Sequence, residues 1–393
     1  MARKLRNATA IVIALLVLAY IVLRFIVAPY ADNNMNKRID LGAYQVSEKA
    51  KTLHSKLTIM DWHADTMLWN RDLLEKADRG HVDLPRMQEG NIALQMFTTV
   101  TKTPRGQNLN ANDASSDNIT LLSVAQGWPG RTWDSLLERA LFQAEKLDGY
   151  IQASQGQLMW VRTQAELKAL MQARHASSTP APIGVLLGTE GAHPLEGSAA
   201  NIDKLYKAGF RMVGLVHFFD NRLGGSLHGA EKGGLTEFGK AVVRELEKRE
   251  IIIDLAHASE QVAWDTLAIT TRPVVVSHTG FHGHCDTPRN FSDELMQEIA
   301  RKGGLVAVGF WDSAACGDMP ADIAASIAYG IHLLGEDHVA LGSDWDGTVK
   351  ALDASDIETI TDALLRRGLS DETIAKVMGG NSVYFLSEWL PKS

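Results

Sequence analysis

Short apolar runs recur along the chain, with little alternation between apolar and polar positions. Runs of this kind that are rich in Val, Ile and Leu are typical of parallel strands buried on both faces. Eight of them follow residue 50, at residues 57–62, 92–97, 183–187, 212–216, 251–255, 273–276, 305–310 and 339–341. This pattern predicts eight buried strands.

Segments with the apolar spacing of amphipathic helices accompany the later runs. They cover residues 235–248, 261–269, 293–302, 323–334 and 354–366. Strands that alternate with helices in this way predict an α/β fold, a closed (β/α)8 TIM-type barrel, in a single domain at residues 51–393. The polar stretch at residues 31–50 is interpreted as a short stalk.

The spacing is uneven between the second and third runs, where residues 101–182 form a long insertion. Its first part, residues 103–118, is rich in Gly, Asn, Asp and Ser and predicts a surface loop. Residues 133–153 and 163–172 have helical patterns. An insertion of this length is a candidate for a lid over the site or for the surface of a homodimer.

The first 30 residues differ in kind from the rest. Arg3, Lys4 and Arg6 precede an apolar run at residues 8–23, which Arg24 interrupts before residues 25–28 resume it. A positive flank before an apolar stretch of about 20 residues indicates a secretion signal or an uncleaved membrane anchor. No clean A-x-A cleavage site follows, which favours the anchor. A buried amphipathic helix is the alternative. With the positive residues inside, everything after Pro29 is expected outside the cytoplasm.

Composition narrows the classes of function. The chain has 393 residues, 45% of them apolar, and a formal net charge of −8. No long basic block follows the first residues, which argues against nucleic acid as a partner. The two cysteines, Cys285 and Cys316, are an even pair in an exported chain, and this pattern fits either a disulfide or two buried thiols.

Metal-competent side chains follow six of the eight predicted strands. The carboxyl ends of barrel strands meet at one face, where the active site lies. Taken alone, each residue has an ordinary structural explanation, such as a turn residue or a helix N-cap. Their coincidence at one rim is what points to a site, because clustered buried carboxylates and imidazoles need a cation. In chain order they are His63, Asp65, Glu190, His217, His257, His278 and Asp344.

Imidazole and carboxylate ligands together suit Zn²⁺, with manganese or iron as alternatives. Four or five ligands exceed what one catalytic zinc needs, so the set predicts two metals that share a carboxylate and a water. Glu190 is the natural bridge, with His63 and Asp65 on one metal and His257 and His278 on the other. A water shared by two metals becomes a nucleophilic hydroxide near neutral pH, which indicates hydrolysis or deamination.

The remaining polar residues suggest the substrate. His217 is free to donate a hydrogen bond to the oxyanion of a tetrahedral intermediate. Asp344 could carry a proton to a leaving amine or hold a substrate ammonium. Arg289 could bind a carboxylate with two hydrogen bonds, with a surface ion pair as the alternative. A carboxylate binder and an ammonium binder on either side of two metals describe a dipeptide.

Specific motifs surround these residues. They are Asp61-Trp62-His63-Ala64-Asp65, Gly188-Thr189-Glu190-Gly191, Leu215-Val216-His217, Ile253-Asp254-Leu255-Ala256-His257-Ala258-Ser259, Ser277-His278, Arg289-Asn290, Gly342-Ser343-Asp344-Trp345-Asp346-Gly347 and Gly380-Asn381. With them, the chain from about residue 57 to residue 390 resembles the membrane (renal) dipeptidase family, zinc peptidases of the amidohydrolase-like barrels.

The resemblance implies that His63 and Asp65 bind the first zinc, that Glu190 bridges, and that His257 and His278 bind the second. It implies substrate contacts from His217 and Arg289 and an acid/base role for Asp344. The family cleaves dipeptides, often accepts a D-residue at the C-terminal position, and in some members opens carbapenem-type β-lactams. Cys285 matches a family cysteine that pairs with one near Cys316, which implies a disulfide.

The sequence also departs from the family. Animal members carry a C-terminal lipid anchor, whereas this chain ends in Trp389-Leu390-Pro391-Lys392-Ser393 without an apolar tail. The N-terminal segment would then serve as the anchor, which suits a bacterial inner membrane with the catalytic domain on the periplasmic face. The insertion after Val100 has no counterpart that we can place.

Two other readings compete with a dipeptidase. The first is another amidohydrolase on the same barrel, such as a deaminase, lactamase or lactonase. Those enzymes usually begin with His-x-His and often use a carboxylated lysine, whereas here the first strand ends in His-x-Asp and Glu190 has no lysine nearby. The His-x-His pair at His282 and His284 follows the sixth strand and is interpreted as pocket lining or surface. The second reading is a non-catalytic binding protein, which a missing ligand would favour, and none is missing.

Overall fold

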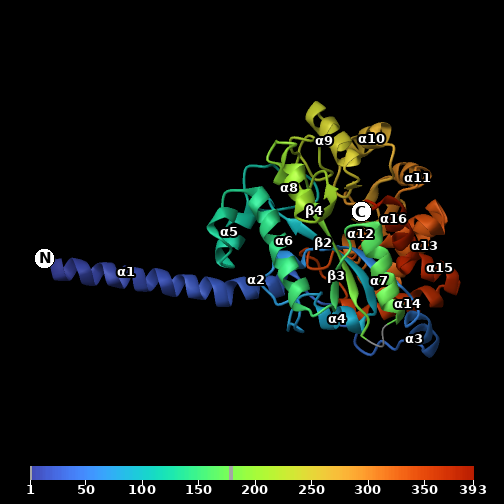
Figure 1. Ribbon diagram of the computed structural model, residues 1–393, viewed down its shortest axis with the longest axis horizontal. Coiled ribbons are helices and arrows are strands. Elements are labelled where there is room, and N and C mark those ends of the chain that lie inside the picture. The colour runs from blue at the N-terminus through green and yellow to red at the C-terminus, as the bar shows by residue number, and fades with distance from the viewer. Residues whose placement is uncertain (1, 177–179) are drawn as a thin grey trace.

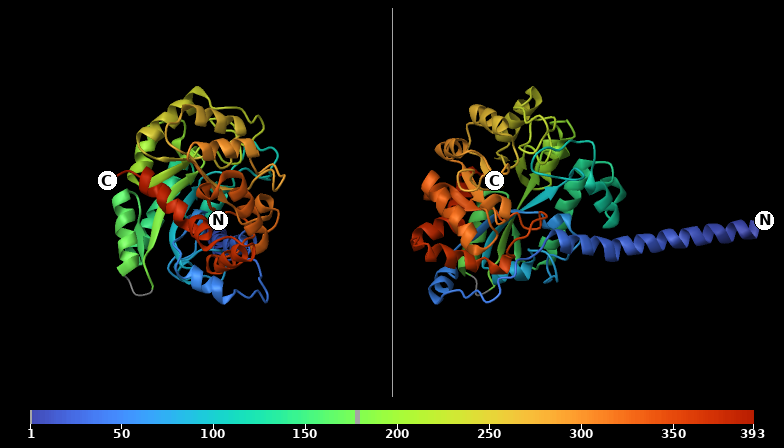
Figure 2. Two further views of the ribbon diagram at one scale, coloured as in Figure 1. Left: turned by 90° about the vertical axis from the view of Figure 1, so that its right-hand side faces the viewer. Right: turned by 180° about the vertical axis from the view of Figure 1, so that it is seen from behind.

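Eight parallel strands close into a barrel in the computed structural model, which describes residues 2–176 and 180–393. Each strand pairs with its neighbour in the order β1-β2-β4-β5-β6-β7-β8-β9, and β9 returns to β1. Figures 1 and 2 show the helices around this barrel. The strands are β1 (Ile59–Ala64), β2 (Ile92–Val100), β4 (Ile183–Glu190), β5 (Phe210–Gly214), β6 (Ile252–Asp254), β7 (Val275–Thr279), β8 (Leu305–Val308) and β9 (Val339–Leu341). The predicted (β/α)8 barrel is confirmed.

Every residue of these eight strands is buried, which explains why the sequence shows apolar runs without alternation. The outer helices follow the same logic, with one apolar face on the barrel. They are α3 (Glu48–His54), α4 (Leu84–Glu89), α8 (Asn201–Lys207), α9 (Glu237–Lys248), α10 (Glu260–Ile269), α11 (Asp293–Arg301), α12 (Asp312–Ala315), α13 (Pro320–Leu334), α14 (Glu358–Arg366), α15 (Asp371–Ala375) and α16 (Asn381–Trp389).

The insertion at residues 101–182 contains the two predicted helices, as α6 (Leu136–Ala153) and α7 (Gln164–Ala176). It also contains α5 (Asn118–Ala125) and the strand β3 (Leu158–Trp160), which the pattern did not predict. The strand β3 pairs with the beginning of β4, and β5 pairs with the later part of β4. A strand of three residues is too short to leave a periodic signal. Residues 177–179 of the insertion lie outside the described residues, and its part in a homodimer stays a prediction.

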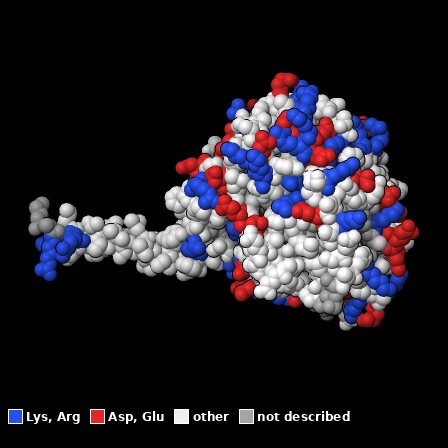
Figure 3. Space-filling model, in the orientation of Figure 1, with Lys and Arg blue, Asp and Glu red and all other residues white. Residues whose placement is uncertain are grey.

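A single long helix projects from the body at the N-terminus (Figures 1 and 2). It runs through α1 (Ala2–Val22), a π-helical segment at Leu23–Val27 and α2 (Ala28–Met35). The helix Arg3–Met35 is long and apolar enough to cross a membrane, and a window of 18 residues within it has a mean hydropathy of 2.9. Figure 3 shows basic side chains at its free tip and a largely uncharged surface along its length. The helix continues past residue 30, so residues 31–35 are helical and belong to its last turns.

Candidate metal centre

The carboxyl ends of the barrel strands bring all seven predicted residues to one rim. His63 lies in β1 and His278 in β7, Glu190 ends β4, and the other four follow their strands within three residues. All seven are buried. The backbone N–H of Asp65 donates to the carbonyl of Trp345 at 2.8 Å, which holds the loop after β9 against the end of β1.

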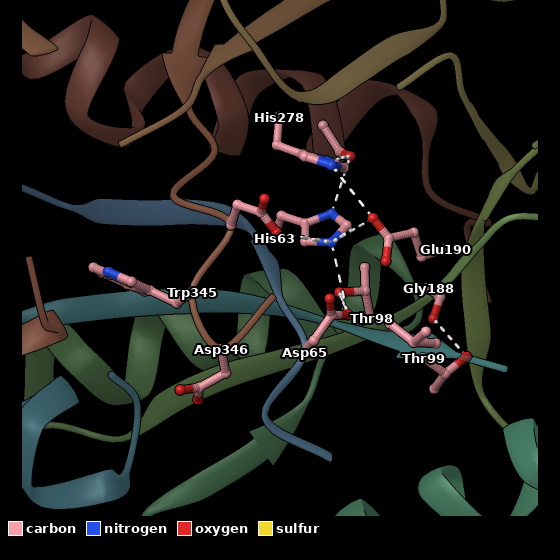
Figure 4. A network of polar contacts seen from close by, with 12 residues as sticks. His63, Asp65, Thr98, Thr99, Gly188, Glu190, His278, Trp345 and Asp346 are labelled. Atoms are coloured by element: carbon pink, nitrogen blue, oxygen red, sulfur yellow. Dashed lines mark hydrogen bonds and ion pairs between the residues drawn. The ribbon is translucent and has the colours of Figure 1, made fainter. Parts of the chain in front are cut away.

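The Glu190 carboxylate contacts most of this group, and Figure 4 shows it beside His63 and His278. Its Oε1 lies 3.5 Å from Nε2 of His63, 3.1 Å from Nε2 of His257 and 3.4 Å from Nε2 of His278. Its Oε2 lies 3.2 Å from Nε2 of His217. Nε2 of His63 in turn lies 3.7 Å from Oδ1 of Asp65. One carboxylate therefore faces imidazoles from four different strands.

The candidate ligand atoms gather in two groups, within each of which they lie no more than 4.8 Å apart. Glu190 belongs to both groups, as a bridging carboxylate would. The groups do not follow the predicted pairing, because His278 falls with His63, and His257 falls with His217. They are His63, Glu190, His278 and Asp344, and Glu190, His217 and His257.

The donor set fits divalent metal ions. Nε2 of His63 is buried and has no hydrogen-bond partner among the described residues, although three carboxylates lie within 4.0 Å of it. Buried polar atoms are nearly always paired, so a ring nitrogen that faces carboxylates without a hydrogen-bond partner is suited to bind a cation. Nitrogen and oxygen ligands of this kind suit zinc and its neighbours in the first transition row.

The charges of the centre lead to the same conclusion. Burial, followed by the charge of Asp65, raises the pKa of Glu190 well above its usual value. Burial also raises the pKa of Asp344, to about 7. Burial disfavours the charged form of His63, but the carboxylates of Asp65, Glu190 and Asp344 outweigh it and raise its pKa to about 10. The carboxylates repel one another, and a bound cation relieves that repulsion.

Two residues behind the centre were not assigned a role from the sequence. The hydroxyl of Ser277 donates to Oδ2 of Asp254 at 2.6 Å, and it lies 2.9 Å from Nδ1 of His278 and 3.2 Å from Nδ1 of His63. Such partners fix the ring orientation of metal-binding histidines. Both residues belong to motifs that the chain shares with the family, but the sequence around them does not indicate that they contact each other or the two histidines.

Two functional side chains stand on left-handed backbone. The φ angles of His257 and Asp344 are 63° and 61°. Non-glycine residues are uncommon in this region, and such positions gather at active sites. After His257, the chain turns at once into α10, where Ser259 caps the helix by accepting from the N–H of Val262 at 3.0 Å. This explains the serine of the Ile-Asp-Leu-Ala-His-Ala-Ser motif.

Arg289 is part of the cavity and not of a surface ion pair. Only 3% of it is exposed, and its Nη2 donates to the carbonyl of His278 at 2.7 Å. Its guanidinium lies 5.3 Å from the centre of the Trp311 ring. Burial lowers its pKa to about 10, so it stays charged at neutral pH. A fixed, buried cation of this kind is suited to binding a carboxylate.

The His-x-His pair lies apart from the centre. His282 is exposed and pairs with Asp286 at 2.9 Å, and His284 packs beside Tyr329. Neither lines the cavity. In the same loop, Cys285 forms a disulfide with Cys316, as the resemblance implied.

A cavity of about 650 Å³ opens over the centre. Asp65, Glu190, His217, His257, Arg289 and Asp344 line its polar floor. Its outer wall is mainly apolar and includes residues of α5 and of the N-terminal helix. The predicted site residues outside this cavity surface are His63 and His278, which lie fully buried beneath it.

A (β/α)8 barrel with a metal-competent rim and an open cavity defines a metal-dependent hydrolase. The chain belongs to the membrane dipeptidase family, peptidase family M19, whose family model matches residues 47–389. It is therefore an enzyme that acts on peptide bonds, and the predicted family is confirmed.

Relatives and solved structures agree with this. Dipeptidase aclJ of Aspergillus oryzae is 27% identical over 356 residues, which cover 85% of this chain and 78% of that protein. The probable dipeptidase PvdM of Pseudomonas aeruginosa shares the fold with a TM-score of 0.73 at 19% identity, over 88% of this chain and 98% of that one. A metallopeptidase of Rhodobacter sphaeroides, liganded with a phosphinate mimic of the dipeptide L-Ala-D-Ala, has a TM-score of 0.68 at 24% identity, over 85% and 99%.

Proposed function

We propose that this chain is a zinc-dependent dipeptidase with two Zn²⁺ ions. In the pairing that the family resemblance implies, His63 and Asp65 would hold one ion, His257 and His278 the other, and Glu190 would bridge them, whereas the distances group His278 with His63 and His257 with His217. The observation that carries this proposal is the position of the Glu190 carboxylate, which lies between 3.1 and 3.5 Å from four imidazole nitrogens. When bound, the metal pair supplies a bridging hydroxide near neutral pH and polarises the scissile carbonyl.

The chain's own residues complete the reaction. Burial lowers the pKa of His217 well below its usual value, so its imidazole is neutral and donates a hydrogen bond to the developing oxyanion without giving up its proton. Asp344 lines the cavity and follows β9, which neighbours β1 on the side away from β2. Burial raises the pKa of its carboxyl to about 7, so this carboxyl can carry a proton at neutral pH. It passes that proton to the leaving amine.

The substrate is a dipeptide held at both ends. Arg289 binds its carboxylate. Asp344 holds its ammonium only when ionised, which is the alternative to the proton transfer described above. The Rhodobacter sphaeroides metallopeptidase binds a mimic of a dipeptide with a D-residue at the C-terminal position. We extend that tolerance to this chain because Arg289 recognises the carboxylate and not the side chain beside it.

The helix Arg3–Met35 is proposed as an uncleaved anchor with the catalytic domain outside the cytoplasm, on the periplasmic face of a bacterial inner membrane. Two observations support retention. Asp32, near the end of the helix, is buried in the body against Arg71 and Arg79, and Nη1 of Arg24 donates to the carbonyl of Gln126 at 2.7 Å. The disulfide supports an oxidising compartment.

The test combines activity with a metal count. The full chain is assayed for hydrolysis of Gly-D-Ala and of L-dipeptides before chelation, after it and after zinc is returned, and bound metal is measured by mass spectrometry. Glu190→Gln is expected to lower kcat by about 10³ or more and to hold fewer than two ions. His282→Ala, which changes an exposed histidine outside the cavity, is the matched control and should keep both ions and full activity.

Two results would contradict the proposal. One is full hydrolysis by metal-free protein. The other is a Glu190→Gln variant that is folded, active and still loaded with two ions.

A further inference from the structure

The helix α5 of the insertion has an apolar outer face. Its inner face packs into the body through Ile119 and Ser123, which are buried. Leu121 and Val124 lie three residues apart on the opposite face, where Leu121 is 61% exposed and Val124 is half-buried. A helix whose outer side faces water carries polar residues there. The outer face of α5 is therefore suited to an apolar neighbour.

The segment that contains this helix is also free of charge. Residues 118–130 include no Asp, Glu, Lys or Arg, whereas 22% of the whole chain is charged. Beyond residue 35, four large apolar side chains are exposed among the described residues, and they are Leu121, Trp133, Met319 and Tyr384. Two of these four belong to α5 and to the turn that follows it. Exposed apolar side chains that gather in one uncharged segment indicate an interaction surface.

The end of α5 lies against the N-terminal helix. Figures 1 and 2 show both at the same end of the body. Nη1 of Arg24 donates to the carbonyl of Gln126, the residue after α5, at 2.7 Å. A side chain at Gly127 would collide with the Arg24 guanidinium and would lie close to the Tyr20 hydroxyl. The contact therefore extends from Arg24 to Tyr20, one helical turn toward the N-terminus.

This contact lies at the depth of the membrane boundary. A crossing takes about 20 residues, so a span that begins at Ala8 ends near Val27. At about 1.5 Å per residue, Arg24 lies about 5 Å inside that end and Tyr20 about 10 Å. Helices that lie in the membrane interface are buried about 5–10 Å into the boundary between headgroups and acyl chains. The contact with the N-terminal helix thus holds α5 at the depth of an interfacial helix.

The same contact accounts for Arg24, the charged residue that interrupts the apolar run. A charged side chain within a membrane span is costly unless it is paired. A cation near the C-terminus of a helix is stabilised by the carbonyls that the helix leaves unpaired. Gln126 supplies such a carbonyl, so Arg24 finds its partner in the protein. Arg24 and the end of α5 therefore stay together where the N-terminal helix leaves the bilayer.

We propose that α5 is a second membrane contact, whose outer face around Leu121 lies in the outer leaflet of the bilayer that the N-terminal helix crosses. The partner is lipid, because the face is apolar, the segment is uncharged and the surface is continuous with the spanning helix. This inference rests on the proposed anchor and not on the peptidase activity. A single helix leaves the catalytic domain free to turn about it, and the second contact fixes the domain's orientation to the membrane.

The test measures what surrounds Leu121. The zinc-loaded full chain carries Leu121→Cys with a nitroxide label, in phosphatidylethanolamine–phosphatidylglycerol vesicles. Both native cysteines are in the disulfide, so the label attaches to the introduced thiol. Oxygen enters lipid, whereas the polar complex Ni-EDDA is excluded from it. The ratio of the oxygen collision rate to the Ni-EDDA collision rate should be at least about threefold higher at position 121 than at an exposed position in water.

Two further positions calibrate the measurement. Tyr384→Cys is the matched control, because Tyr384 is also apolar and is 68% exposed, on α16 at the far side of the body (Figure 2). It should report water. Val12→Cys, within the apolar run of the N-terminal helix, should report lipid. Unchanged thermal melting shows that each variant is folded.

Val12→Cys separates the inference from the anchor on which it rests. If position 12 reports water, the proposed anchor falls and the inference falls with it. If position 12 reports lipid and position 121 matches position 384, the anchor stands and the inference is overturned. Low collision rates of position 121 with both reagents would mean that protein, such as a second copy of the chain, covers α5, and this result overturns the inference as well.

Discussion

Two of the four histidines around Glu190 contact the buried hydroxyl of Ser277, which does not line the cavity. The hydroxyl of Ser277 donates to Asp254, so its oxygen accepts from Nδ1–H of both His63 and His278. A single hydroxyl thus sets the direction of two rings whose other nitrogens face the centre. Metal affinity should be sensitive to this contact, although Ser277 itself would bind no metal.

We expect Ser277→Ala to weaken zinc binding 10- to 100-fold, because both rings lose the partner that orients them. Competition with a chromophoric chelator measures the change. Ser326→Ala is the control, since Ser326 is equally buried but its hydroxyl has no hydrogen-bond partner among the described residues. Equal zinc affinity in the two variants would show that Ser277 does not position the rings.

His193 is a second buried residue with a measurable consequence. It stacks on Phe219 with ring centres 4.6 Å apart, and burial lowers its pKa to about 3. In the unfolded chain the imidazole of His193 takes up a proton near pH 6.5, whereas in the folded chain it stays neutral at that pH. The stability that the neutral ring contributes is therefore complete above pH 6.5 and is lost as the pH falls from there toward 3.

His193→Phe should remove this loss, because phenylalanine keeps the stacked shape and takes up no proton. Its free energy of unfolding, relative to that of the wild type, should rise by about 1.4 kcal/mol for each pH unit below 6.5. Thermal unfolding between pH 7.5 and 5 measures the slope. His332→Phe, at an exposed position of α13, should leave the slope unchanged. Parallel pH profiles for His193→Phe and the wild type would refute the prediction.

At the scale of elements, the loops at the strand ends need support of their own. The loop after β7 carries Arg289 and is tied to α12 by the disulfide between Cys285 and Cys316. Nδ2 of Asn290 donates to the carbonyls of Cys285 and Ala314 at 2.9 and 3.0 Å. These links hold Arg289 at the cavity over the centre.

Cys316→Ser should therefore affect both stability and substrate binding. Opening a crosslink between residues 31 apart costs about 3–4 kcal/mol in the chain-entropy account. KM for a dipeptide should rise more than kcat falls, because Arg289 loses its fixed position. The double variant Cys285→Ser/Cys316→Ser, which leaves no unpaired thiol, should behave alike. An unchanged melting temperature in both variants would contradict this account.

At the scale of the whole molecule, the N-terminal helix and the barrel meet at the mouth of the cavity. Arg71 joins them, since its guanidinium pairs with Asp32 of α2 at 3.1 Å and with Asp346, two residues after Asp344, at 2.8 Å. Asp346 in turn accepts from the N–H of His81 and from the hydroxyl of Thr66. The base of the helix is thus continuous with the loop that carries Asp344.

Asp32→Ala should lower the free energy of unfolding by up to about 3 kcal/mol, because Arg79 loses its buried partner and Arg71 keeps only Asp346. The midpoint of thermal unfolding of the full chain in detergent is the measurement. Asn33→Ala changes an exposed neighbour on the same helix and should have no effect. If the two variants melt together, the helix is not held through this network.

Much of this molecule could be predicted from short stretches of sequence. The eight apolar runs overlap the eight barrel strands, because a strand that is buried on both faces needs apolar residues at consecutive positions. The strand β3 and the helix α5 were not predicted from such a pattern. The role of Ser277 could not be predicted either, because a serine beside a histidine is ordinary in sequence and its contacts with His63 and Asp254 arise only when β1, β6 and β7 meet.

The amino-acid sequence by itself determined which strands form and which residue types stand at their carboxyl ends, since both depend on neighbours a few positions apart. Only the tertiary structure decided that Glu190 faces four imidazoles at once, that Arg289 is buried, and that Leu23 and Val27 line the cavity. Those distances depend on how the barrel closes and where the helix rests, which no local pattern encodes.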